Sequence, residues 1–224
     1  MDNYIAEFKS GNFQNKKEFV NQFVKSEDKS VFLKGCRTFM AVCTHEDFVL
    51  LNDFFVSGDE EYLQVFLAYV KESLSLQVIP YLLALLEEWE DTEPGIRIHQ
   101  IIMEMLGKYC DEEISDVEEC GKEFVDFSQT NDLQKYYFKG QVINYGSLTK
   151  ELITIVMSCR SANRPFYAST LTDILSNSFG IECPVSSGEI ITDEKTARIF
   201  EYVKMLAEIN PEPGTKYYFG NKIG

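Results

Sequence analysis

The chain offers few residues for nucleophilic catalysis, because it contains only two histidines and six cysteines. Cys43 lies two positions before His45, but closeness in sequence is not the spatial pairing that activates a thiolate. His99 is expected on the polar side of its helix, and neither histidine has an active-site pattern around it. Ser147 and Lys150 match the pattern Ser-x-x-Lys without the partner motifs of that enzyme class, so Ser147 is better explained as a helix cap. We predict no catalytic residue and a protein that is not an enzyme.

Carboxylates are the other groups that could carry chemistry. Asp111, Glu112, Glu113 and Asp116 supply the oxygen ligands that Ca²⁺ and Mg²⁺ prefer, but the glycine and final glutamate of an EF-hand loop are missing. The sequence also has no Cys-x-x-Cys pair and no glycine motif for phosphates or dinucleotides. We predict neither a metal site nor a cofactor. An enzyme assembled from scattered carboxylates leaves no linear motif, so that alternative stays open.

Acidic residues are concentrated near the middle of the chain. Between positions 87 and 123, thirteen acidic residues stand against three basic ones, which leaves ten of the 15 net negative charges there. On a helical hairpin and its linker these charges would add into one field that attracts a basic protein partner. The alternative is a solvated surface that only maintains solubility. The predicted partner-binding residues are Glu87, Glu88, Glu90, Asp91, Glu93, Asp111, Glu112, Glu113 and Asp116.

Composition restricts the other ligand classes. A net charge of -15 opposes binding to nucleic acid or to anionic membranes. No apolar stretch approaches 18 residues and no signal-peptide pattern opens the chain, so we predict a cytoplasmic protein that does not span a membrane. The dispersed cysteines are interpreted as reduced thiols, mostly in the core.

Helical periodicity dominates the hydrophobic pattern. We expect helices over residues 60–70, 81–89, 97–106, 148–159, 165–177 and 193–208. Gly107 is a stop signal after the third of these, and Pro184 and Gly188 mark residues 180–191 as a loop. The fold class is therefore predicted to be all-α, built from paired antiparallel helices.

The segment over residues 79–107, IPYLLALLEEWEDTEPGIRIHQIIMEMLG, resembles one repeat of the HEAT type. Two helices flank a short acidic turn; Asp91 stands in that turn and Ile96-Arg97 opens the second helix, as is common in that family. The resemblance implies an α-solenoid arrangement and nothing about activity.

A shift of 105 residues aligns the chain with itself. Residues 17–20 (KEFV) fall on residues 122–125 (KEFV), and residues 32–35 (FLKG) fall on residues 137–140 (YFKG). We predict two related helical halves, 1–110 and 111–224, within one continuous globular unit. The tetrapeptide KYYF also occurs twice, at 135–138 and 216–219; it is interpreted as aromatic packing, with exposed partner anchors as the alternative.

An acidic helical-repeat protein without catalytic motifs resembles the immunity proteins that bacteria use to neutralise polymorphic toxins, several families of which have HEAT-like α-repeats. The resemblance implies a stoichiometric inhibitor whose acidic edge meets a basic toxin domain. Three other hypotheses stay open. They are a scaffold or adaptor that uses the concave face of a helical stack, an enzyme with a carboxylate-lined pocket, and a regulator recognised through residues 180–191.

Overall fold

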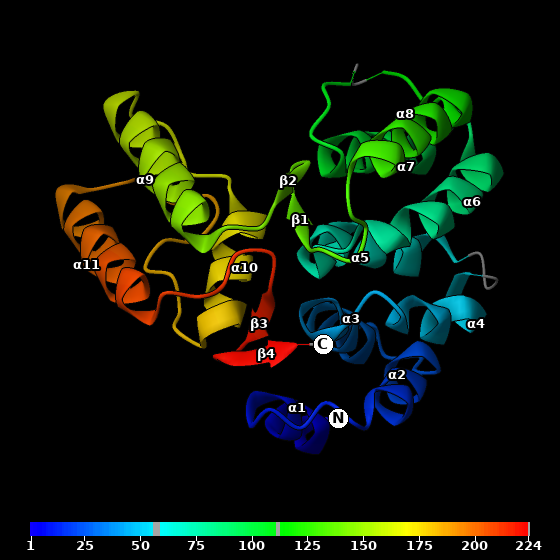
Figure 1. The fold of residues 1–224 in the computed structure, drawn as a ribbon, viewed down its shortest axis with the longest axis horizontal. Helices are drawn as coiled ribbons and strands as arrows, with labels where there is room; N and C mark the ends of the chain where they lie inside the picture. Colours follow the sequence, from blue (N-terminus) through cyan, green and yellow to red (C-terminus); the bar gives the residue numbers. More distant parts are fainter. Residues whose placement is uncertain (56–58, 111–112, 224) are drawn as a thin grey trace.

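The helical period of the sequence is realised along most of the chain (Figure 1). The computed structural model describes residues 1–55, 59–110 and 113–223. Within these ranges the protein is mainly α-helical, with two short antiparallel β-hairpins, so the predicted fold class is confirmed. The solenoid arrangement and the HEAT-type repeat stay predictions.

Helices from the N-terminal part rise one after another along the right side of Figure 1, and those from the C-terminal part lie on the left. The first group comprises α1 (Asp2–Lys9), α2 (Lys16–Val24), α3 (Lys29–Val42), η1 (Asp47–Leu51), α4 (Asn52–Phe55), α5 (Glu60–Tyr69), η2 (Val70–Ser73), η3 (Leu76–Val78), α6 (Ile79–Trp89), α7 (Glu93–Met105) and α8 (Val117–Thr130). The second group comprises α9 (Tyr145–Ser161), α10 (Ser169–Phe179) and α11 (Asp193–Ile209). Helix α8 packs on α6 and α7, so the N-terminal packing continues past residue 110.

Local signals set most helix ends. The Asp59 carboxylate accepts the backbone N–H of Glu61 at 3.0 Å and caps α5. Gly107, with φ +71°, follows the end of α7 in the left-handed conformation that glycine adopts without steric cost. The predicted stop at this glycine is confirmed.

Three predicted helix starts were wrong. Helix α7 begins at Glu93 and not at residue 97, because Thr92 caps it: the Thr92 hydroxyl accepts the Gly95 backbone N–H at 3.2 Å. Asn144, not Ser147, caps α9, because the Asn144 side chain accepts the Ser147 backbone N–H at 3.1 Å. Helix α10 begins at Ser169 and not at residue 165, because Pro165 forms an isolated antiparallel bridge with Ile190. The bridge holds the chain extended before the helix can start.

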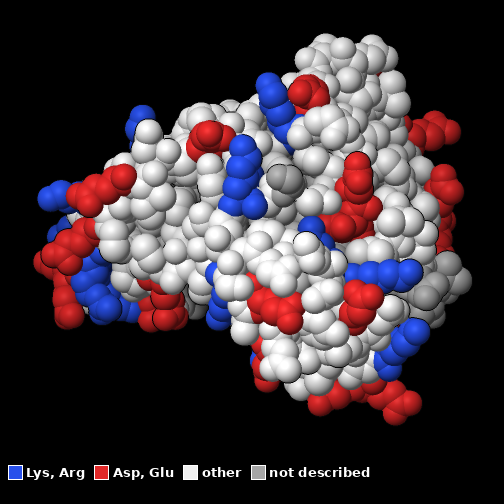
Figure 2. Space-filling model, turned by 60° about the horizontal axis from the view of Figure 1, so that its bottom comes forward, with Lys and Arg blue, Asp and Glu red and all other residues white. Residues whose placement is uncertain are grey.

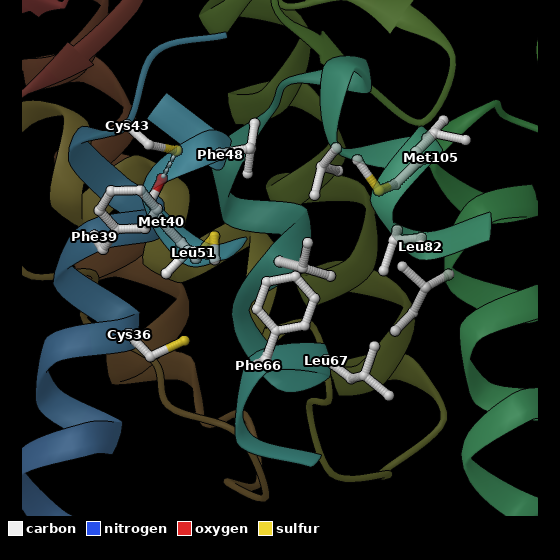
Figure 3. Close-up of a cluster of buried hydrophobic side chains, with 14 of the residues drawn as sticks. Cys36, Phe39, Met40, Cys43, Phe48, Leu51, Phe66, Leu67, Leu82 and Met105 are labelled. Atoms are coloured by element: carbon white, nitrogen blue, oxygen red, sulfur yellow. Dashed lines mark hydrogen bonds between the residues drawn. The ribbon is translucent and has the colours of Figure 1, made fainter. Parts of the chain in front are cut away.

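Buried side chains form two hydrophobic cores. The first core joins α2, α3, α5, α6 and α7, and Figure 3 shows part of it, from Phe39 and Met40 on α3 through Phe66 on α5 to Leu82 on α6. The second core lies among α9, α10 and α11 and includes Leu152, Leu175 and Ile199. Burial of these apolar surfaces is the main force that holds each set of helices together.

Several residues pack in one core although their neighbours in sequence pack in the other. Tyr136 belongs to the second core, whereas the next residue, Tyr137, belongs to the first. Leu74, between η2 and η3, packs in the second core, and Tyr218 and Ile223 from the C-terminus pack in the first. The end of the chain is therefore part of the N-terminal packing.

Both KYYF segments enter β-hairpins. Strand β1 (Tyr137–Phe138) pairs with β2 (Gln141–Val142), and β3 (Lys216–Tyr218) pairs with β4 (Asn221–Ile223). Each turn has two residues of positive φ with glycine second, as type I′ turns require: Lys139 (+49°) and Gly140 (+71°), then Phe219 (+49°) and Gly220 (+78°). Tyr136, Tyr137 and Tyr218 are at most 5% exposed, so the predicted aromatic packing is confirmed.

The hairpins also contradict one part of the predicted duplication. Residues 32–35 lie within α3, whereas residues 137–140, which the 105-residue shift places on them, form a strand and a turn. The similarity in sequence therefore does not extend to secondary structure at this point.

A buried carboxyl group lies where elements of the two cores meet. Glu72 of η2 is 4% exposed; its side chain accepts the Asn177 amide from α10 at 3.3 Å and hydrogen-bonds Asp173. Asp173 in turn accepts the Arg37 guanidinium from α3 at 2.8 Å. Burial, followed by the negative charge of Asp173, raises the pKa of Glu72 to about 8. Glu72 therefore holds a proton at neutral pH.

This proton links folding to pH. Between about pH 4.5 and pH 8 the folded chain keeps a proton on Glu72 that the unfolded chain has lost, so this group makes stability fall as pH rises. Glu72→Gln mimics the protonated form, and we expect it to remove this slope and to stabilise the protein by roughly 1–3 kcal/mol at pH 8.5. Urea unfolding at pH 5.5, 7 and 8.5 measures the effect. The exposed Glu201→Gln is the control, and equal slopes in the two variants would contradict the assignment.

Candidate functional site

The acidic turn predicted from sequence lies between α6 and α7. Leu82, Leu85 and Leu86 face the first core, which leaves the last turn of α6 to carry its acidic residues on the outside. The side chains of Glu87, Glu88, Glu90, Asp91 and Glu93 are all exposed. In the part of the chain that the structure describes, none of these five forms an ion pair with Lys or Arg.

The linker before α8 is fixed beside this turn. The Asp91 backbone N–H donates to Ser115 Oγ at 3.3 Å, and the Asp116 N–H donates to His99 Nδ1 on α7 at 3.0 Å. Asp116 also caps α8, since its Oδ1 accepts the Glu119 N–H at 2.8 Å. The structure therefore brings Asp116 next to the turn acids.

Of the three remaining predicted residues, the structure describes only one. Glu113 is exposed on the same linker. Asp111 and Glu112 lie outside the described residues. We use the name acidic edge for Glu87, Glu88, Glu90, Asp91, Glu93, Glu113 and Asp116.

His99 is a positioning residue that the sequence interpretation placed wrongly. It was expected on the polar side of its helix but is 1% exposed. Helix α7 is covered by α5 and α6 and also by α8, so it has more than one buried side. Met103, one turn after His99 and also buried, was the signal for this second buried stripe.

Among the described residues, ion pairs form near the five acids of the α6–α7 turn but do not involve them. Glu104 contacts Lys71 at 2.6 Å and Glu123 contacts Lys108 at 2.8 Å. On the face of the molecule seen in Figure 2, acidic and basic side chains are likewise interspersed. Surface pairs of this kind neutralise the local field, whereas the unpaired carboxylates of the turn keep theirs.

His45 does not serve as a base for Cys43, because both of its ring nitrogens bind other groups. Burial raises the pKa of the Cys43 thiol, and the structure gives all six cysteines as free. Both ring nitrogens of His45 are engaged, Nδ1 with Ser75 Oγ at 2.8 Å and Nε2 with the Gln134 carbonyl at 2.9 Å. Burial lowers the pKa of His45, so its ring is a neutral, hydrogen-bonded part of the fold.

Clusters of metal-ligating side chains and membrane-spanning helices are both absent from the described residues. Among residues 1–55, 59–110 and 113–223, no three His, Cys, Asp or Glu side chains gather closely enough to hold a metal ion. Over the same ranges, no helix combines the length and hydropathy that crossing a bilayer requires.

The structure is thus that of a mainly helical protein whose α6–α7 turn carries exposed carboxylates that form no ion pair with Lys or Arg of the described residues. A family model described as immunity protein 47 matches residues 2–223, and the chain belongs to this immunity protein family. Membership implies that its binding partner is a toxin. No curated protein and no solved structure gives a significant match.

Proposed function

We propose that the protein is a stoichiometric inhibitor that binds a basic surface of its toxin through the acidic edge. The observation that carries the proposal is the set of exposed carboxylates at the α6–α7 turn without basic partners, held beside Asp116 by hydrogen bonds from the neighbouring backbone. Family membership supplies the toxin as partner class.

Inhibition in this proposal needs no chemistry on the toxin. The acidic edge attracts a basic surface of the toxin, and the bound inhibitor covers that surface. Because α6, α7 and α8 pack on one another, the carboxylates are presented by a rigid support and lose little freedom on binding.

Salt dependence tests the electrostatic part of the proposal. We expect the association rate with the toxin to fall roughly tenfold between 50 and 500 mM NaCl, with a smaller change in the dissociation rate. Surface plasmon resonance with the purified toxin domain measures both rates. A salt-independent association rate would favour the scaffold hypothesis, in which apolar contacts dominate.

The toxin itself is found by affinity purification of the tagged chain from its native cell. We expect a protein with a basic domain to co-purify in a one-to-one ratio. Co-purification of an acidic protein alone would contradict the proposal.

A further inference from the structure

A cleft of about 550 Å³ opens where elements of the two cores face each other. Lys71 of η2 and Glu104 of α7 line one side of it, and the turn after β1, helix α9 and the start of α10 line the other. Clefts of this size between packing units are common places for a ligand or a partner's side chain.

The floor of the cleft is apolar. Phe138 and Ile155 are half-buried there, and Leu171 is buried. Tyr167 stands at the rim and is 74% exposed, an unusual exposure for a large aromatic side chain. Aromatic residues beside an apolar pocket are typical anchors of protein interfaces.

The charges around this floor do not cancel. Lys71 is paired with Glu104 at 2.6 Å, and Lys139 is paired with Glu151 at 2.7 Å. Arg164 donates to the Ser158 hydroxyl at 2.9 Å and, within the described residues, has no carboxylate partner. The cleft therefore carries three bases and two acids, an excess positive charge in a chain of net charge -15.

We propose that this cleft receives an acidic loop of the bound toxin, with a carboxylate on Arg164 and a neighbouring apolar or aromatic side chain on the floor. Arginine is suited to this contact because its planar guanidinium can bind both oxygens of a carboxylate. The inference rests on the proposed function only for the identity of the partner.

One partner can reach both the acidic edge and the cleft. Glu93 opens α7 at the acidic edge, and Glu104 in its last turn lines the cleft. At 1.5 Å per residue these positions are roughly 16 Å apart along the helix. A standard interface of about 800 Å² per partner covers such a distance. Contacts of opposite charge at the two ends of α7 would then fix the orientation of the toxin.

The test uses a probe peptide, so that it does not depend on the toxin. The end-blocked hexapeptide Gly-Ser-Asp-Phe-Ser-Gly is titrated into the ¹⁵N-labelled full chain, and the amide signals of residues 169–171 are followed by NMR. A peptide with Asn in place of Asp, and inorganic phosphate alone, form the comparison arms. Arg164→Ala is the test variant, and Arg198→Ala, which removes an exposed arginine away from the cleft, is its matched control.

We expect saturable, millimolar binding of the Asp peptide, weakened about tenfold by Arg164→Ala or by Asn in the peptide, and unchanged by Arg198→Ala. Absent saturation, equal binding of both peptides, or insensitivity to Arg164→Ala would overturn the inference. Inorganic phosphate that binds as tightly as the Asp peptide would also overturn the inference, because the cleft would then be a site for small anions.

The peptide result is independent of the acidic edge. A chain whose acidic edge is reversed should still bind the peptide, so loss of toxin binding in that variant concerns the proposed function alone. Conversely, salt-dependent toxin binding without peptide binding would refute the cleft and leave the proposed function standing.

Discussion

Reversal of the acidic edge is expected to weaken toxin binding at least roughly 100-fold without unfolding the protein. The variant combines Glu87→Lys, Glu88→Lys, Glu90→Lys and Asp91→Asn. Asparagine replaces Asp91 because that residue has φ +61°, a conformation that Asn adopts more readily than Lys. Lysine is favourable at positions 87 and 88 because they lie in the last turn of α6, near the negative end of its dipole.

The control carries the same change in net charge elsewhere. Glu182→Lys, Glu201→Lys, Glu208→Lys and Glu194→Gln alter exposed residues in and before α11. Affinity for the toxin is measured by calorimetry, and circular dichroism checks the fold of both variants. If the two variants bind with equal affinity, only net charge matters and the acidic edge is not the binding surface.

Removal of Lys216 is expected to destabilise the protein by about 3–5 kcal/mol. This side chain on β3 is 2% exposed, and its ammonium donates to the carbonyls of Met40 at 2.7 Å and of Cys43 at 3.0 Å, at the end of α3. The Met40 carbonyl has no helical donor, because the Thr44 N–H donates to the Asp47 carboxylate instead. Lys216 therefore caps α3 and ties the C-terminal hairpin to the first core.

Three variants separate the parts of this effect. Lys216→Ala removes the donors and leaves a cavity, whereas Lys216→Met keeps most of the volume and should lose only about 1–3 kcal/mol. Lys222→Ala removes an exposed lysine from the adjacent strand β4, and a loss below about 1 kcal/mol is expected. Urea unfolding gives the free energies. Equal stability of Lys216→Ala and Lys222→Ala would refute the capping role.

Burial of Lys216 also lowers its pKa, because the charged form loses its hydration. The third Lys216 contact, to Cys43 Sγ, is longer, at 3.7 Å. In Figure 3 the Cys43 sulfur is also linked to the Met40 carbonyl, which shows how closely the groups at this helix end are packed. Substitution of Lys216 or of Cys43 is therefore expected to disturb the contacts of the other residue.

The sequence by itself determined the helices and the acidic character of the turn between α6 and α7. Both depend on residues within one or two turns of one another. Apolar side chains at helical spacing define the buried face of α6, and the glycine at 107 ends α7 whatever lies around it. For the same reason Glu87 to Glu93 could be predicted as an exposed group.

Only the tertiary structure decided which groups hold the two cores together. It also decided where the cleft between the cores lies. Lys216 meets Met40 across 176 positions, and the cleft joins residues from Lys71 to Leu171. Likewise, His99 becomes a buried acceptor for Asp116 only because α8 returns to cover α7. Such contacts depend on how whole helices pack, and no local pattern records which distant backbone group will approach a given side chain.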